Sequence, residues 1–174
     1  MIIGLLETSS QLQVYLFDFK RVEMNEFSIF PNVMVVNQEI TAQIILENLE
    51  KEMEKRFRYL ESKGFREIDP VRDKMERIVV GIDECTDLTG KVPKSHPDYV
   101  TIEKARLSLD HLSRKARACG IHLILATQKI DSDSLDTRVR PSRQPILALH
   151  TERTIRTAHT IDAIPTVHTT NTIS

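Results

Sequence analysis

Two carboxylates and one amide follow short apolar runs, in positions where they could act on a phosphate group. Asp83 and Glu84 come directly after residues 78–82 (IVVGI), and Gln128 comes shortly after the apolar residues 121–126. If both runs are parallel strands, their carboxyl ends meet at one edge of the sheet. In phosphoryl transfer one carboxylate would hold Mg²⁺ through its waters, and the other would orient the attacking water. The alternative is a pair of solvated acids at a strand end.

Gln128 and Arg117 are candidates for contacts with a phosphate. The Gln128 amide follows a predicted strand and could contact a γ-phosphate, and the guanidinium of Arg117 has a planar fork that suits phosphate oxygens. Each also has an ordinary explanation, as a loop glutamine and as a solvated arginine beside Arg114 and Lys115. The four residues together are therefore more informative than any one of them.

The spacing of apolar residues in the first half of the chain predicts two extended segments followed by a long helix. Residues 13–17 (QVYLF) predict a buried strand, and residues 30–36 predict a shorter extended segment. From residue 38 to residue 63 the apolar side chains recur every three or four positions, which predicts a long helix with one apolar face. Asn37 is its expected N-cap, and Gly64 suits the C′ position.

The second half predicts two more strands and another helix. The near-continuous apolarity of residues 78–82 is typical of a parallel strand buried on both faces, which we expect at the centre of the sheet. Residues 87–100 contain Gly90, Pro93 and Pro97 and predict a loop. A helix over residues 102–119, ended by Gly120, then precedes a strand over 121–126. This alternation predicts an α/β fold with a mostly parallel sheet.

Composition limits the class of protein. The 174 residues, 40% hydrophobic and 28% charged, are ordinary for one globular domain or part of one, and a net charge of −1 argues against a wholly basic nucleic-acid binder. The longest apolar runs fall far short of the roughly 20 residues that cross a bilayer. Cys85 and Cys119, without a CxxC pair or a signal peptide, indicate free thiols and a cytoplasmic protein.

Residues 150–174 differ from the rest, so we divide the chain into a domain over residues 1–149 and a tail. His150, His159 and His168 are each followed by threonine in a segment rich in that residue. This low complexity predicts a disordered tail. A zinc site of these histidines is disfavoured, because a spacing of nine places no two of them on adjacent turns of a helix and no cysteine lies near.

Five blocks in order resemble the motor domain of the FtsK/SpoIIIE family of DNA-pumping ATPases, especially the versions carried by conjugative elements. The resemblance covers about residues 12–138. Its blocks are residues 16–24 (LFDFKRVEM), 30–34 (FPNVM), 52–59 (EMEKRFRY) with 64–66 (GFR), 78–84 (IVVGIDE) and 117–128 (RACGIHLILATQ).

The resemblance implies a RecA-like P-loop NTPase fold and a ring, expected to be a hexamer, that uses ATP and Mg²⁺ to move along double-stranded DNA. By this analogy Asp83 and Glu84 are the Walker B pair, with Asp83 holding Mg²⁺ through water. Gln128 is the amide that senses the γ-phosphate, and Arg117 is the arginine finger offered to a neighbouring subunit. Asp18, Lys20 and Glu23 match a further family signature, to which the sequence assigns no individual roles. A role in chromosome segregation and a role in conjugation both remain open.

The chain also departs from the family. No G-x-x-x-x-G-K-[ST] sequence occurs in it, so we expect an N-terminally truncated domain without the phosphate cradle and its strand. Such a domain would have a gap in its sheet, beside the strand that leads to Gln128. We therefore expect poor stability and no hydrolysis by the chain alone. From residue 140 onward the resemblance ends.

Two alternatives stay open. A type VII secretion-like ATPase, which moves proteins, shares the regions around residues 18–20 and 126–128, although residues 21–23 and the region of Arg66 favour the DNA branch. A non-enzymatic remnant is the other alternative, motivated by the absent cradle. Contacts with DNA are not evident, because the small basic run of Arg138, Arg140 and Arg143 is explained equally well as solvated surface.

Overall fold

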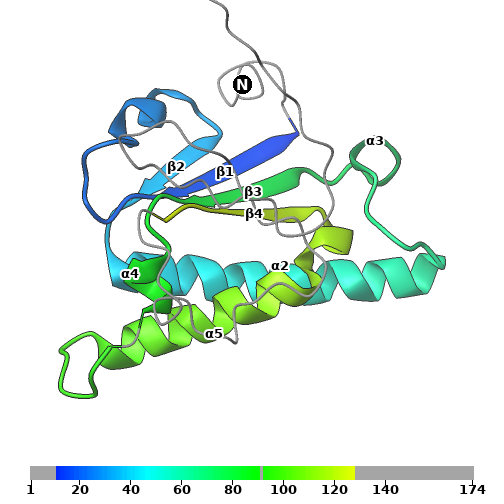
Figure 1. Ribbon diagram of the computed structural model, residues 1–174. Coiled ribbons are helices and arrows are strands. Elements are labelled where there is room, and N and C mark those ends of the chain that lie inside the picture. The colour runs from blue at the N-terminus through cyan, green and yellow to red at the C-terminus, as the bar shows by residue number, and fades with distance from the viewer. Residues whose placement is uncertain (1–10, 91, 128–174) are drawn as a thin grey trace, which may run out of the picture.

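A parallel four-stranded sheet is the centre of the fold. The computed structural model describes residues 11–90 and 92–127. In chain order the strands are β1 (Leu12–Phe17), β2 (Val33–Val36), β3 (Arg77–Ile82) and β4 (Ile121–Leu125). They lie in the order β2-β1-β3-β4, and every neighbouring pair is parallel (Figure 1). The predicted α/β class and parallel sheet are confirmed, and β3 has a strand on each side, as its continuous apolarity predicted.

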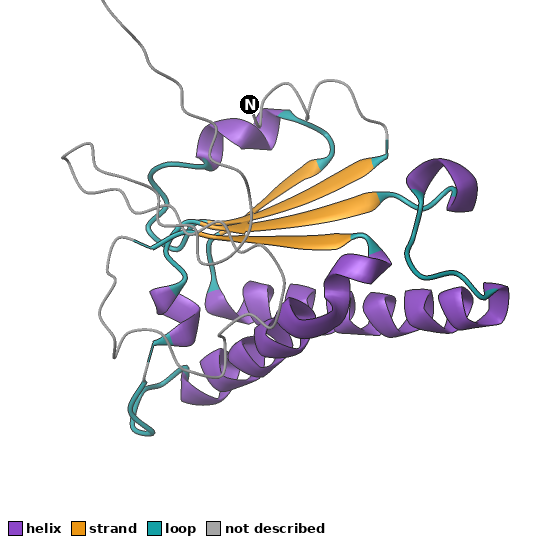
Figure 2. Ribbon diagram, turned by 45° about the vertical axis from the view of Figure 1, so that its right-hand side comes forward, coloured by secondary structure: helices purple, strands orange, loops and turns teal. Residues whose placement is uncertain are grey.

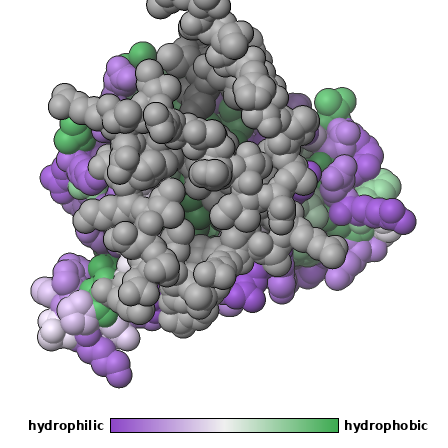
Figure 3. Space-filling view, in the orientation of Figure 1, coloured by the Kyte–Doolittle hydropathy of each residue, from purple (hydrophilic) through white to green (hydrophobic). Residues whose placement is uncertain are grey.

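Two helices cover one face of the sheet. Helix α2 (Glu39–Lys63) and helix α5 (Tyr99–Lys115) lie side by side beneath the strands (Figures 1 and 2). Their apolar stripes pack on the strand residues that face them, including Phe17, Val80 and Ile121, which are fully buried. Hydrophilic side chains cover the right-hand side of the molecule, where the carboxyl half of α2 lies (Figures 1 and 3). The layers thus follow from the period of the apolar residues.

The opposite face of the sheet carries a smaller apolar cluster. Val14, Leu16 and Val33 are buried there, and the 3₁₀ helix η1 (Asn25–Ile29) packs over β1 and β2 on that side (Figure 2). The side chains of Val79, His122 and Ile124 on the same face of β3 and β4 are half-buried. The described part of the chain therefore has one thick and one thin apolar layer.

The residue that ends α2 is the predicted one, whereas the residue that caps its amino end is one position from the prediction. The residue that caps the amino end is Gln38, without a side-chain capping bond, so the prediction of Asn37 was wrong by one position. The spacing of apolar residues along a helix does not specify which of two neighbouring polar residues caps its amino end. At the carboxyl end Gly64 has φ 66°, the left-handed conformation predicted for the C′ position.

The segment between β3 and β4 contains more helix than the sequence predicted. A single-turn helix, α4 (Thr86–Thr89), occupies the start of the expected loop, and α5 begins at Tyr99 rather than at residue 102. Its last turn tightens into the 3₁₀ helix η2 (Ala116–Cys119). The apolar side chains on the inward face of this segment are all buried: Ala105, Leu109, Leu112, Ala116 and Cys119. Gly120 ends this segment with φ 73°.

A short helix precedes β3. Helix α3 (Pro70–Asp73) begins at Asp69, whose carboxylate accepts hydrogen bonds from the backbone N–H groups of Val71 and Arg72. Proline at its first position is typical of a helix start, because that N–H has no partner within the helix. Helix α3 and η2 lie at the amino ends of the strands, whereas α4 lies at their carboxyl ends (Figure 1).

Several predictions concern residues outside the described ranges. They are the amide Gln128, the basic run Arg138 to Arg143, the tail over 150–174 with its three histidines, and the division at residue 149. The expected gap beside β4 also stays a prediction, since β4 is the last strand of the sheet within residues 11–90 and 92–127. No helix in these ranges is long and apolar enough to cross a membrane.

Candidate active site at the carboxyl edge of the sheet

The register of the strands brings their carboxyl ends level. Phe17 pairs with Ile82, and Ile82 pairs with Leu125, so the next residue of each strand emerges at the same edge. Backbone bonds continue beyond the strands: the Asp83 N–H donates to the Phe17 carbonyl at 3.2 Å, and the Cys85 N–H donates to that of Ala126 at 2.8 Å. The backbone that carries Asp83 and Glu84 is therefore fixed from both neighbouring strands.

Glu84 points into the protein at this edge. Its side chain is 7% exposed, and Oε1 accepts hydrogen bonds from Thr86 Oγ1 at 2.6 Å and from Thr127 Oγ1 at 2.8 Å. The Lys20 Nζ lies 4.0 Å from Oε2. A carboxylate this buried requires hydrogen-bond donors or a cation, and Glu84 has both.

Asp83 lies beside Glu84 and is half-buried. Partial burial raises its pKa, the negative charges of Glu23, Asp18 and Glu84 raise it further, and Lys20 acts in the opposite direction. Burial followed by the Glu84 charge also raises the pKa of Asp87, on α4. The edge is thus an acidic surface in which an added cation would be stabilised.

Asp18 organises the loop after β1. Its side chain is 1% exposed and accepts backbone hydrogen bonds from Arg21 at 2.8 Å, Glu23 at 3.0 Å and Met24 at 3.0 Å. Burial opposes ionisation, but these N–H donors outweigh it and lower the pKa of Asp18. Arg21 has φ 60° within this loop, a conformation that few residues other than glycine adopt. The loop so formed presents Lys20 to Glu84.

The side chains present fit a magnesium ion that is held mainly by phosphates. No cluster of three or more His, Cys, Asp or Glu side chains in the described ranges could enclose a metal ion by itself. Mg²⁺ usually keeps several waters and binds one or two carboxylates together with substrate phosphates. Asp83, at the rim of the edge with a raised pKa, is suited to be that carboxylate.

Arg117 lies at the other edge of the sheet. It is exposed on η2, before β4 begins, and a five-residue strand such as β4 spans about 16 Å. Burial lowers the pKa of His122, and the positive charges of Arg77 and Arg117 lower it further, so these two arginines lie near that ring. The structure brings Asp83 and Glu84 together and places Arg117 away from them.

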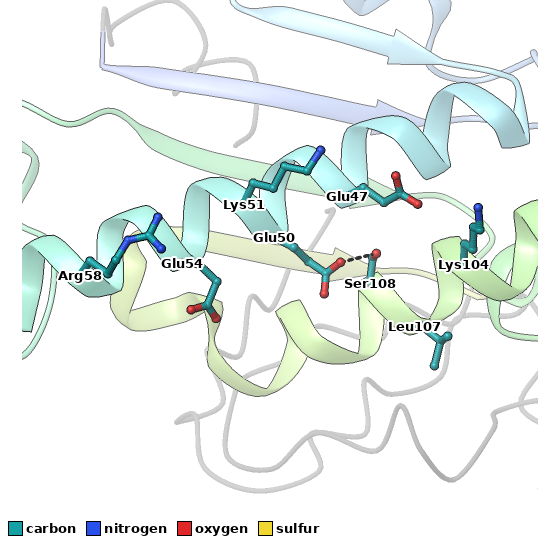
Figure 4. Close-up of a pocket in the computed structure, with 8 residues that line it drawn as sticks. All are labelled: Glu47, Glu50, Lys51, Glu54, Arg58, Lys104, Leu107 and Ser108. Carbon is teal, nitrogen blue, oxygen red and sulfur yellow. Dashed lines mark hydrogen bonds between the residues drawn. The ribbon is translucent and has the colours of Figure 1, made fainter.

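Two other features do not belong to this site. An open groove between α2 and α5 is lined mainly by charged side chains, and Glu50 reaches across it to accept a hydrogen bond from Ser108 Oγ at 2.5 Å (Figure 4). It lies in the helical layer, away from the carboxyl edge. Cys85 and Cys119 are buried free thiols, as predicted, and burial raises the pKa of each to about 11. Neither is a reactive nucleophile at neutral pH.

Comparison with known proteins gives the family. A sequence profile described as the FtsK/SpoIIIE family matches residues 1–77. The chain is 32% identical over 135 residues to the DNA translocase SftA of Bacillus subtilis (strain 168), a match that covers 71% of this chain and 13% of that protein. It belongs to the FtsK/SpoIIIE family.

A second curated relative is also a DNA translocase of this family. The DNA translocase FtsK of Caldanaerobacter subterraneus subsp. tengcongensis is 30% identical over 155 residues, which cover 82% of this chain and 21% of that protein. The chain thus spans about a fifth or less of the length of these two curated relatives.

Solved structures support the same fold. The conjugation coupling protein TcpA of pCW3, in a monomer form with ATPγS, has a TM-score of 0.70 at 23% identity, over 80% of this chain and 40% of that one. The cytoplasmic domain of EssC has a TM-score of 0.58 at 17% identity, over 79% of this chain and 27% of that one. At these identities the likeness is one of fold.

Sequence reasoning missed the roles of four side chains at the carboxyl edge of the sheet. Asp18 and Lys20 were noted only as part of a signature, and Thr86 and Thr127 were not singled out. Thr86 stands two residues after Glu84, and Thr127 stands directly before Gln128, so their proximity in sequence to predicted site residues was an available signal.

Proposed function

We propose that this chain carries the catalytic carboxylate edge of an ATP-driven motor that moves double-stranded DNA. The observation that carries the proposal is the buried Glu84, fixed at the carboxyl edge of a parallel sheet with the half-buried Asp83 beside it. A carboxylate pair at this edge is the arrangement that phosphoryl-transfer enzymes use to position a metal ion and a water.

Each residue has a separate role. Asp83 would hold Mg²⁺ through its waters, and Glu84 would orient and deprotonate the attacking water. Gln128 would contact the γ-phosphate, and Arg117 would reach the nucleotide of a neighbouring subunit in a ring, in line with its exposed position at the opposite edge. When bound, the Mg²⁺·ATP complex supplies the phosphoryl group and neutralises its charge.

DNA is the substrate that the relatives favour. The matches at 30–32% identity are named DNA translocases, whereas EssC, a structural neighbour at 17% identity, supports only the fold. Movement of DNA, a hexameric ring and a role in conjugation or segregation are parts of the proposal. The chain itself contains no G-x-x-x-x-G-K-[ST] sequence, and the test below therefore supplies a phosphate cradle in a joined segment.

The test restores that segment. A domain made by joining a glycine–lysine phosphate loop and its strand ahead of Met1 should hydrolyse ATP in the presence of Mg²⁺, with stimulation by double-stranded DNA. Glu84→Gln should lower kcat by at least about 100-fold, since general bases contribute 10²–10⁴-fold. Glutamine keeps an oxygen that can accept from Thr86 and Thr127, so the fold is retained.

Two results would contradict the proposal. Hydrolysis that continues at full rate in the Glu84→Gln variant would show that another group activates the water. Stimulation by a secreted protein and not by DNA in the same assay would assign the motor to protein transport. Asp98→Asn, on an exposed residue at the amino end of α5, is the matched control and should leave kcat unchanged.

A further inference from the structure

Two threonine hydroxyls bind the same oxygen of the Glu84 carboxylate. Thr86 Oγ1 and Thr127 Oγ1 both donate to Oε1, at 2.6 and 2.8 Å, and the Thr86 N–H lies 3.4 Å from the same atom. The atom nearest Lys20 is the other oxygen, Oε2. Two donors on one oxygen fix both the position and the rotation of the carboxylate plane.

The donors come from two different elements. Thr86 begins α4, four residues after the end of β3, and Thr127 lies two residues after the end of β4. The Cys85 N–H bond to the Ala126 carbonyl, at 2.8 Å, fixes the distance between these two backbones. Thr127 is 3% exposed, so its hydroxyl is directed into the protein. The carboxylate is therefore clamped between a helix start and a strand end rather than by a mobile loop.

We propose that Thr86 and Thr127 are positioning residues that orient the Glu84 carboxylate toward the attacking water. This inference rests on the proposed function, because it assumes that Glu84 acts on water. A base works efficiently when its acceptor oxygen is held within hydrogen-bond reach of the proton it takes. The two hydroxyls on Oε1 therefore hold the carboxylate in the orientation in which it meets the water.

The first test replaces each hydroxyl by a methyl group of the same size. In the completed domain, Thr127→Val should lower kcat for ATP hydrolysis about tenfold, the effect of losing one orienting hydrogen bond, and leave KM for ATP within about twofold. Thr86→Val should act in the same direction. Thr127→Ser, which keeps the hydroxyl, should restore at least half of kcat.

A buried threonine that does not touch Glu84 provides the control. Thr89 is fully buried on the same short helix, and its hydroxyl donates to the Cys85 carbonyl at 2.8 Å. Thr89→Val removes a buried hydroxyl and should leave kcat unchanged. If Thr127→Val keeps or exceeds the parent kcat, or if Thr89→Val lowers kcat equally, the positioning role is overturned.

A second readout does not need hydrolysis. In the 174-residue chain, the side-chain carboxyl ¹³C signal of Glu84, assigned by its loss in Glu84→Gln, should shift in Thr127→Val and Thr86→Val but not in Thr89→Val. An unshifted signal in both variants overturns the clamp. A shifted signal together with full hydrolysis by Glu84→Gln supports the clamp and shows that the proposed function is what failed.

Discussion

Asp18 and Asp83 are one position beyond the ends of adjacent strands, and their environments move their pKa values in opposite directions. Asp18 accepts backbone hydrogen bonds from Arg21, Glu23 and Met24 that outweigh its burial and lower its pKa, whereas burial and the charge of Glu23 raise the pKa of Asp83. One aspartate is therefore bound into the architecture and stabilises it. The other is kept at a cost in stability, which is typical of residues retained for function.

Asp83→Asn should stabilise the chain at neutral pH. Because the folded-state pKa is raised, Asp83 favours the folded state only at pH below its unfolded pKa, and this contribution is lost as pH rises through the folded pKa. We expect the variant to gain about 0.5–1 kcal/mol of unfolding free energy at pH 7 and nothing at pH 3. Urea unfolding at the two pH values measures this, with Asp98→Asn as the control. A loss of stability at pH 7 would contradict the assignment.

Asp18→Asn should have the opposite effect. The folded-state pKa is lowered, so the stabilisation is present above the unfolded pKa of about 3.9 and is lost as pH falls through the folded pKa. An amide nitrogen cannot accept from the N–H groups of Glu23 and Met24, and we expect a loss of about 2 kcal/mol at pH 7 in urea unfolding. A change below about 0.5 kcal/mol would mean that the loop does not depend on this carboxylate.

Sequence could identify the acidic pair but not the side chains that hold it. An apolar run that ends in Asp83 and Glu84 is readable because strand period and residue type are local properties. The contacts of Thr127 and Lys20 with Glu84 depend on which strands are neighbours and on a loop with an unusual conformation at Arg21. Neither is specified by composition or period, so the structure was needed to find them.

At the scale of elements, Arg56 joins three parts of the fold. Its side chain is buried within α2, pairs with Glu52 at 2.8 Å, and donates to the carbonyls of Glu76 at 2.8 Å and Cys119 at 2.9 Å. These carbonyls precede β3 and β4. A single guanidinium thus connects the helical layer to the amino ends of β3 and β4.

Arg56→Leu should therefore destabilise the chain by about 3 kcal/mol, since it leaves the buried Cys119 carbonyl and the partly buried Glu76 carbonyl without this donor and removes the pairing with Glu52. Arg58→Leu, on the exposed side of the same helix, should change the free energy of unfolding by less than about 0.5 kcal/mol. Chemical denaturation of both variants checks the prediction. Equal effects would mean that helix propensity, and not the buried contacts, determines the result.

The elements themselves were largely predictable, and the errors were local. Both long helices and all four strands follow from apolar period, and Gly64 and Gly120 from the need for a left-handed residue at a helix end. The N-cap was misplaced by one residue. Helix α4 was missed because a single turn has no period to detect, and its fully buried Leu88 and Thr89 reflect tertiary packing rather than local pattern.

At the scale of the whole molecule, stability depends on what adjoins β4. Within the described ranges β3 is its only paired neighbour, and Ile124 and His122 on its thinner-covered face are half-buried. A strand edge without a partner leaves backbone groups without hydrogen bonds and limits burial of the adjoining face. A domain with a stability of only about 5–15 kcal/mol is sensitive to such a loss.

Joining the phosphate-loop strand ahead of Met1 should therefore raise the free energy of unfolding by at least about 3 kcal/mol, through added strand pairing and buried apolar area. Urea denaturation of the 174-residue chain and of the completed domain, both without nucleotide, measures the difference. A control in which the joined strand has the same composition in a scrambled order should give little of this gain, because its apolar residues no longer alternate toward the core. If the intact and scrambled segments stabilise the chain equally, the added strand does not pair with the sheet, and the expected gap beside β4 does not exist.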